Sequence, residues 1–211
     1  MSEPGAHEFT VVASRTVYRG AILALRTDEL AMPGGSTGTR EVVEHHGAVA
    51  ILAVDEDDQV IMIHQYRHPV GRRLWELPAG LLDLADEEPA DAAARELVEE
   101  AGVSATHWSV LVDVAPSPGS SDEAVRVFLA LGLSAVDRPD GEQEEADLVV
   151  HRVAFDEAVA RVLAGDIVNA PTVAGLLALA ASRASGTAPR AVTAPWLDRP
   201  RAFNARAAES R

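Results

Sequence analysis

One segment, Leu77–Val103, constrains the fold of this chain more than any other, because its residues specify a turn, a loop and a helix in that order. Positions 78–80, Pro-Ala-Gly, are typical of a tight turn. An acidic loop follows, and Pro89 suits the first turn of a helix, where its missing N–H costs nothing. Gly102 suits the end of that helix, since glycine readily adopts the left-handed conformation found there. The segment therefore predicts a helix that begins near Pro89 and stops at Gly102.

The predicted helix has two contrasting faces. With a helical step of about 100° per residue, three carboxylates fall within one third of the circumference: Glu96, Glu99 and Glu100. Small and aliphatic residues occupy the opposite side: Ala90, Ala94, Leu97 and Ala101. We therefore expect the apolar face to pack on a sheet while the other face presents clustered carboxylates.

Clustered carboxylates repel one another unless water, a shared proton or a hard cation relieves the repulsion. The helix composition alone favours the simplest alternative, a solvated face on which Arg95 and Glu99 form an i,i+4 ion pair. The spacing of the whole segment favours a bound cation instead.

That spacing resembles the signature of the Nudix hydrolases, G-x5-E-x7-R-E-U-x-E-E-x-G-U, in which U is aliphatic. The corresponding residues are Gly80, Glu87, Arg95, Glu96, Leu97, Glu99, Glu100, Gly102 and Val103. The match from Arg95 onward is complete, but six residues rather than five separate Gly80 from Glu87. Either the loop carries one extra residue, or Asp86 takes the place of the glutamate.

The resemblance implies a divalent-metal site. In this family the carbonyl of the turn and the glutamates of the helix bind the ions, which corresponds to Ala79, Glu96, Glu99 and Glu100 here. We expect Mg²⁺ or Mn²⁺, and more than one ion, because both metals accept carboxylate, carbonyl and water oxygens. Glu100 is also predicted to take part in catalysis. The implied reaction is hydrolysis of a substituted nucleoside diphosphate, with water attacking phosphorus.

Three features outside the segment resemble the ADP-ribose pyrophosphatase subgroup of this family. Pro118 lies sixteen residues beyond Gly102, residues 40–45 resemble the N-terminal strand of the subgroup, and residues 65–67 with 74–80 resemble its approach to the signature. The resemblance implies hydrolysis of ADP-ribose to AMP and ribose 5-phosphate. Two alternatives stay open: a pyrophosphatase for another nucleoside diphosphate derivative, and a non-catalytic module that senses ADP-ribose.

In ADP-ribose pyrophosphatases of this family, a glutamate on a loop after the signature acts as the base or orients the water. The acidic loop at 137–147 carries Glu142, Glu144 and Glu145. We predict that Glu145 has this role, with Glu144 as the second candidate. The alternative is a solvated acidic loop without a catalytic role, because loop carboxylates are common.

The net charge of −15 repels anionic substrates at long range, so local arginines must reverse the field near the site. By the same resemblance, we predict that Arg40 and Arg67 bind the diphosphate and that Glu123 binds a ribose hydroxyl. A guanidinium group can hold phosphate with two parallel hydrogen bonds. The alternative for either arginine is a surface ion pair with Glu41 or Glu44.

The order of the predicted elements indicates an α/β or α+β sandwich, a mixed sheet between helices, which is also the fold that the resemblance implies. Residues 1–45 are predicted to form a small antiparallel sheet, which is too small to be stable alone. Residues 46–183 would form the hydrolase domain and residues 184–211 an extended tail. The apolar run at 47–54 predicts a buried strand. The resemblance implies a homodimer that exchanges N-terminal strands, with Arg40 reaching the site of the partner.

Composition narrows the partners and the compartment. The chain has no cysteine, which excludes disulfides, thiolate catalysis and cysteine-ligated zinc. Its apolar runs are too short to span a bilayer, and its acidic charge makes it a poor general binder of nucleic acid. We therefore expect a cytoplasmic protein that acts on a small nucleotide-sugar substrate, without nucleic acid or membrane partners.

Overall fold

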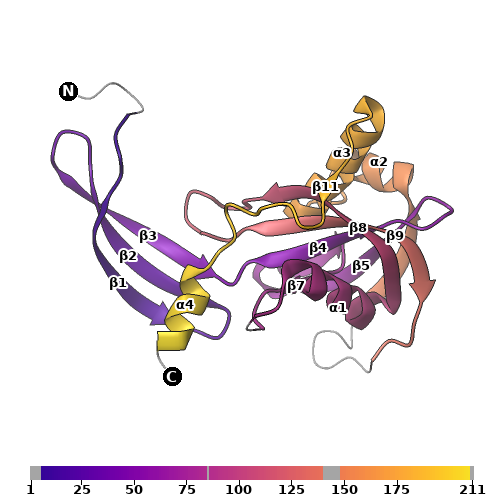
Figure 1. Cartoon of the computed structure of the whole chain (residues 1–211), viewed down its shortest axis with the longest axis horizontal. Helices are drawn as coiled ribbons and strands as arrows, with labels where there is room; N and C mark the ends of the chain where they lie inside the picture. Colours follow the sequence, from indigo (N-terminus) through magenta and orange to yellow (C-terminus); the bar gives the residue numbers. More distant parts are fainter. Residues whose placement is uncertain (1–5, 85, 140–147, 210–211) are drawn as a thin grey trace. The chain divides into compact units, whose positions relative to one another are not determined.

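The computed structural model of the chain describes residues 6–84, 86–139 and 148–209 (Figure 1). The chain divides into two compact units. Unit 1 comprises residues 1–47, 117–123 and 199–211, and unit 2 comprises residues 48–116 and 124–198. Each unit has its own sheets and its own buried side chains.

Unit 1 is built on a three-stranded antiparallel sheet with the order β1-β2-β3. Its strands are β1 (Val11–Arg19), β2 (Leu23–Ala31) and β3 (Thr37–His45). Every residue of β1 is exposed, whereas β2 and β3 each bury part of one face. The helix α4 (Ala202–Glu209) packs on β3. The structure therefore confirms the predicted small N-terminal sheet, and part of the segment predicted as an extended tail is helical.

Unit 2 contains a five-stranded sheet with the order β11-β8-β9-β4-β7 and a three-stranded sheet with the order β10-β5-β6. The strands are β4 (Ala48–Ala53), β5 (Gln59–Arg67), β6 (Arg72–Glu76), β7 (Ala79–Leu81), β8 (Val103–Val114), β9 (Val125–Ala135), β10 (Val149–Ala154) and β11 (Arg190–Ala191). β4 and β9 are parallel, and the other pairs are antiparallel, so the five-stranded sheet is mixed, as predicted.

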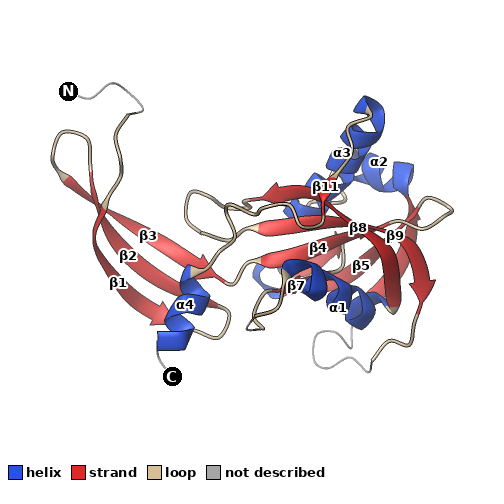
Figure 2. Cartoon of the chain, viewed as in Figure 1, coloured by secondary structure: helices blue, strands red, loops and turns tan. Residues whose placement is uncertain are grey.

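The helices of unit 2 are α1 (Pro89–Ala101), α2 (Phe155–Ala164) and α3 (Ala170–Ser185), with a short 3-10 turn η1 at His68–Val70 (Figure 2). Figure 1 shows α1 on one side of the five-stranded sheet and α2 and α3 on the other. The arrangement is the helix–sheet–helix sandwich that the sequence predicts. None of the helices in the described part of the chain is both long and apolar enough to cross a membrane.

Strand β4 explains how the two helical layers are joined. Ala50 and Leu52 lie in an apolar cluster with residues of α2 and α3, while Val49 and Ile51 lie in a second cluster with residues of α1. Alternate side chains of a strand point to opposite faces, so both faces of β4 are covered. This confirms the buried strand predicted from the apolar run at 47–54.

The packing of α1 corrects one detail of the predicted apolar face. Ala94 is exposed, and the buried stripe instead follows Ala93, Leu97 and Glu100. These residues follow the i, i+4, i+7 spacing of one helix face, so the helix is rotated slightly from the predicted orientation. As a result, the sheet side of α1 includes one of the three clustered carboxylates.

A buried arginine fixes the segment after α3 to the sheet. Arg126 on β9 pairs with Asp113 on β8, with nitrogen–oxygen distances of 2.7 and 3.1 Å. It also donates to the carbonyls of Ala194 and Pro195 at 2.8 and 3.0 Å, and its guanidinium lies over the ring of Trp196. The beginning of the predicted tail is therefore an integral part of unit 2.

Candidate active site

The turn before α1 is held by hydrogen bonds along β4. β7 pairs with β4, so that Ala79 lies opposite Ala50 and Gly80 opposite Val49. The N–H of Ile51 donates to the carbonyl of Pro78 at 2.8 Å. The turn residues therefore have a fixed position at the edge of the five-stranded sheet.

A second element, α3, holds the residue that enters the turn. The N–H of Leu77 donates to the hydroxyl of Thr172 at 3.0 Å, and that hydroxyl donates to the side-chain oxygen of Asn169 at 2.8 Å. Asn169 also accepts from the N–H of Thr172 and caps the helix. Sequence reasoning missed this link. The Asn-Ala-Pro-Thr order signals a helix start, but nothing in it indicates a contact 95 residues away.

Two carboxylates of α1 lie against the backbone of the turn. The carboxylate of Glu100, which is buried, accepts a hydrogen bond from the N–H of Ala79 at 2.8 Å. A side chain at position 80 would overlap the carboxylate of Glu96, so glycine is required for this close approach. The structure thus brings together Ala79, Glu96 and Glu100, three of the four predicted metal ligands.

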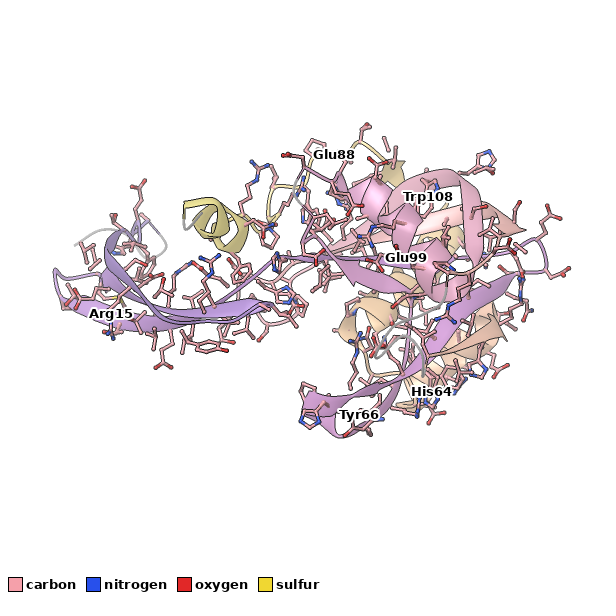
Figure 3. The ribbon with its side chains drawn as sticks, turned by 90° about the horizontal axis from the view of Figure 1, so that it is seen from below. Arg15, His64, Tyr66, Glu88, Glu99 and Trp108 are labelled. Atoms are coloured by element: carbon pink, nitrogen blue, oxygen red, sulfur yellow. The ribbon has the colours of Figure 1, made fainter. Side chains whose placement is uncertain are left out.

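Arg95 forms ion pairs with three carboxylates of this segment. Its Nη1 donates to Glu96 and Glu99 at 2.7 and 2.8 Å, while its Nε and Nη2 each lie 3.0 Å from an oxygen of Glu87. The predicted pair of Arg95 with Glu99 is therefore present, but it belongs to a larger cluster. Glu99 is labelled on α1 in Figure 3.

The same contacts decide which residue takes the first glutamate position of the signature. Glu87 forms the two-pronged ion pair with Arg95, whereas Asp86 is exposed and adopts a left-handed backbone with φ of 65°. The loop therefore carries one extra residue, and the left-handed conformation at Asp86 accommodates it. Aspartate tolerates that conformation better than most residues.

These ion pairs change the acidity of the groups that form them. Hydrogen bonds from Arg95 hold the pKa of Glu87 below its usual range. The pKa of Arg95 is raised, chiefly by its bond to Glu87 and further by Glu96 and Glu99. Glu87 and Arg95 therefore both remain ionised at neutral pH.

The donor set of the turn and α1 fits a hard divalent cation. It consists of carboxylate and carbonyl oxygens, the ligands that Mg²⁺ and Mn²⁺ prefer, and the glycine at position 80 leaves room for Glu96 beside the backbone. In the described residues, however, no group of three or more histidine or acidic side chains is already arranged to hold an ion. The positive charge of Arg95 lies between Glu96 and Glu99, so a bound ion would replace its two hydrogen bonds to them.

Arg67, predicted to bind the diphosphate, lies at the end of β5 and forms a two-pronged pair with Glu76 of β6. The distances are 3.0 Å from Nε and 2.8 Å from Nη2, and Glu76 is buried. The side chain of Arg67 is nevertheless 40% exposed, so Glu76 orients a guanidinium that solvent can reach.

The other two predicted substrate ligands lie in unit 1. The side chain of Arg40 on β3 donates to the carbonyl of Thr39 and forms no ion pair among the described residues. Glu123 ends the loop 117–123 and is close enough to His45 to act on its acidity. Burial lowers the pKa of His45, and the charge of Glu123 opposes that shift. Glu144 and Glu145 lie outside the residues that the structure describes.

Unit 1 also contains an ion-pair cluster that sequence reasoning missed. Arg26 on β2 pairs with Asp28 at 2.8 Å and with Glu44 on β3. Asp28 and Glu44 are 4% and 0% exposed. Nearby, Asp122 accepts a hydrogen bond from the N–H of His45, and burial raises the pKa of Asp122. The alternative in which Arg40 forms a surface ion pair with Glu44 therefore does not hold, because Glu44 is buried and pairs with Arg26.

Comparisons with known proteins find two family models that match the chain. The model of the NUDIX domain matches residues 44–174, and that of the nucleoside diphosphate sugar hydrolase N-terminal domain matches residues 9–43. The chain is 54% identical over 203 residues to an ADP-ribose pyrophosphatase of Mycobacterium tuberculosis. The aligned region covers 96% of this chain and 98% of the relative. It is 32% identical to a methanol dehydrogenase activator of Bacillus methanolicus, over 79% of this chain and 89% of that protein.

One solved structure supports the architecture. The crystal structure of an ADP compounds hydrolase has a TM-score of 0.71 to this chain and covers 86% of it, together with 98% of the solved chain. The sequence identity is 22%, so this likeness bears on the fold alone.

Proposed function

The chain belongs to the Nudix family, and on that premise we propose that it is a divalent-metal-dependent hydrolase that cleaves ADP-ribose to AMP and ribose 5-phosphate. The observation that carries this proposal is the similarity to the mycobacterial ADP-ribose pyrophosphatase, which extends over nearly the whole length of both chains. The carboxylate cluster of α1 supplies the chemistry that such an activity needs.

In the proposed site, the carbonyl of Ala79 and the carboxylates of Glu96, Glu99 and Glu100 hold Mg²⁺ or Mn²⁺. Bound there, the metal would neutralise charge on the diphosphate and lower the pKa of a water molecule. The contributions of the chain are positional: β4 and Thr172 fix the turn, and the N–H of Ala79 orients Glu100. Before an ion binds, Arg95 holds Glu87, Glu96 and Glu99 close together.

Substrate recognition in the proposed enzyme depends on residues outside α1. Arg67, held by Glu76, and Arg40 bind the diphosphate, and Glu123 binds a ribose hydroxyl. Glu145 orients or deprotonates the attacking water, with Glu144 as the second candidate. Replacing Glu145 with glutamine should then lower kcat strongly, and a full rate in that variant would move the role to Glu144.

The proposed enzyme is a homodimer assembled through unit 1. All nine residues of β1 are exposed, and several are large and apolar: Val11, Val12, Val17 and Tyr18, which are 50%, 58%, 49% and 59% exposed. These exposed apolar side chains lie on an edge strand of the sheet β1-β2-β3, where another chain can pair. A monomeric mass in light scattering at micromolar concentration would contradict the dimer.

The deciding experiment is incubation of the protein and Mg²⁺ with a panel of nucleoside diphosphate derivatives, followed by product analysis. We expect ADP-ribose to be cleaved with the highest kcat/KM and to give AMP and ribose 5-phosphate. Higher efficiency with another compound would overturn the assigned substrate. Tight binding of ADP-ribose without turnover of any compound would instead favour a sensing module.

A further inference from the structure

A second group of polar side chains lies on one face of the sheet β10-β5-β6. His64 on β5 lies opposite Trp75 on β6, and His151 on β10 lies opposite Met62 on β5. Because alternate residues share a face, the register places His64, Trp75 and His151 on one side. Arg161 reaches this side from α2. We refer to these four residues as the His-Arg cluster.

The rings of the His-Arg cluster are in direct contact. His64 is stacked on Trp75 with ring centroids 4.6 Å apart and an interplanar angle of 22°. His151 meets Trp75 edge-on at 4.7 Å, and the guanidinium carbon of Arg161 lies 4.2 Å from the centroid of Trp75. All four side chains are partly exposed, so solutes can reach them.

Within the described residues, no carboxylate pairs with the His-Arg cluster, although the chain as a whole is acidic. Among the described residues, Arg161 forms no ion pair, and neither imidazole ring forms a hydrogen bond. Glu157 precedes Arg161 by one helical turn but is not paired with it. For a chain with a net charge of −15, three cationic or protonatable groups without a carboxylate are unusual.

The His-Arg cluster is separate from the carboxylates of α1. Glu76, which is adjacent to Trp75 in the chain, points to the opposite face of the sheet and pairs there with Arg67. Figure 3 shows His64 on β5 well apart from Glu99 on α1. The cluster therefore cannot contribute ligands to the proposed metal site.

We propose that His64, His151 and Arg161 form a binding site for a phosphate monoester dianion, built on the ring of Trp75. A guanidinium stacked on an aromatic ring keeps the N–H groups at its edge available for hydrogen bonds. Imidazole rings held by stacking need little further ordering before they donate. The dianion would supply the negative charge that the described chain does not place there.

The electrostatics of His64 agree with this assignment. Burial lowers its pKa, and the positive charges of Arg73 on β6, His151 on β10 and Arg161 on α2 lower it further. None of the carboxylates in residues 6–84, 86–139 and 148–209 opposes the shift. A bound dianion would reverse it, because an opposite charge nearby favours the protonated imidazole.

The experiment is a pH titration of the imidazole signals of His64 and His151 by NMR in the full chain without divalent metal. Spectra are recorded in sodium chloride and in inorganic phosphate at the same ionic strength, and then with AMP and with ADP-ribose. We expect phosphate and AMP to raise the pKa of both rings by about half a unit or more. ADP-ribose, which carries no terminal phosphate monoester, should have a smaller effect.

Two variants provide the matched comparison. Arg161→Gln should weaken phosphate binding by about tenfold, whereas Arg152→Gln should not, because Arg152 is adjacent to His151 on β10 but pairs with Asp55. The shifts should persist in Glu100→Gln, so they do not depend on the hydrolytic site. Equal pKa values in chloride and phosphate, or an unchanged affinity in Arg161→Gln, would overturn the assignment. The assignment would also be overturned if the pKa of His64 in chloride alone were ordinary or raised. Carboxylates of the chain would then already neutralise the cluster.

Discussion

Both units surround an arginine with carboxylates, but they bury the group to different extents. In unit 1, Arg26 binds Asp28 and Glu44, whose side chains are 6% and 0% exposed. In unit 2, Arg95 binds three carboxylates that are more accessible: Glu87, Glu96 and Glu99, at 15%, 12% and 35%. The residue types are the same, and the surroundings differ.

The difference separates a structural cluster from a functional one. A buried carboxylate that loses its arginine remains without a counter-charge in a poorly solvated place, so the cluster of unit 1 cannot exchange partners. A partly exposed carboxylate can turn from arginine to a metal ion at a modest free-energy cost. We therefore expect substitutions in the Arg26 cluster mainly to alter stability and those of the carboxylates on α1 mainly to alter catalysis.

Glu100→Gln should have the largest effect. The amide oxygen can still accept from the N–H of Ala79, so the fold should persist while the charge is lost. We expect kcat with ADP-ribose and Mg²⁺ to fall by about a thousandfold, which corresponds to roughly 4 kcal/mol. The matched change Glu44→Gln should lower the melting temperature and leave kcat within about threefold. A near-normal rate in Glu100→Gln would refute the metal-site assignment.

Arg26→Met should destabilise unit 1 by about 3–5 kcal/mol, because it removes the guanidinium that pairs with the buried Asp28 and Glu44. Hydrogen exchange of the amides of β2 and β3 would measure this loss. Arg95→Met should cost only about 1 kcal/mol in unit 2. Similar losses of stability in the two variants would show that burial does not distinguish the clusters.

Gly80→Ala tests whether the approach of the backbone to Glu96 matters for catalysis. The added methyl group would displace the carboxylate of Glu96 from the turn. We expect kcat to fall by about a hundredfold, or roughly 3 kcal/mol, with the fold retained in circular dichroism. Gly119→Ala, where a side chain meets no atom within 4 Å, serves as the control and should keep kcat within about twofold.

Glu87→Gln should have the smallest effect, visible as a change in the pH dependence of stability. The folded-state pKa of Glu87 is below its unfolded value, so its contribution is complete above the unfolded pKa and is lost as pH falls through the folded pKa. The free energy of unfolding should therefore differ from that of the original chain by about 1 kcal/mol at pH 6 and by less at pH 3. Asp86→Asn should show no such convergence; if it did, Asp86 rather than Glu87 would be the partner of Arg95.

The local features of the fold were predictable from the sequence, and the long-range contacts were not. Pro89 and Gly102 locate α1, and the apolar run before Asp55 locates β4, because proline, glycine and hydrophobic patterns act within a few residues. The choice between Glu87 and Asp86 depended on the path of the loop. The burial of Glu100 depended on how α1 is rotated against the sheet.

The ion pairs of the candidate site are long-range contacts of this kind and were not predictable from the sequence either. The register of β5 and β6 puts Arg67 and Glu76 on the same face of the sheet, although the residue directly opposite Arg67 is Arg72. A register cannot be read from one strand alone. Likewise, β2 and β3 must pair before Arg26 can meet Glu44. These contacts join charged residues whose sequence context gives no sign of burial.

The hydroxyl of Thr172 has a consequence for how the sequence can vary. It accepts from Leu77 and donates to Asn169, so it transmits the position of α3 to the turn that carries Ala79. Serine can make both bonds, whereas valine has nearly the same shape and can make neither. In a library of random variants, selection for activity should therefore accept serine and discard valine at position 172, although the residue lies in a helix remote in sequence from every glutamate of the signature.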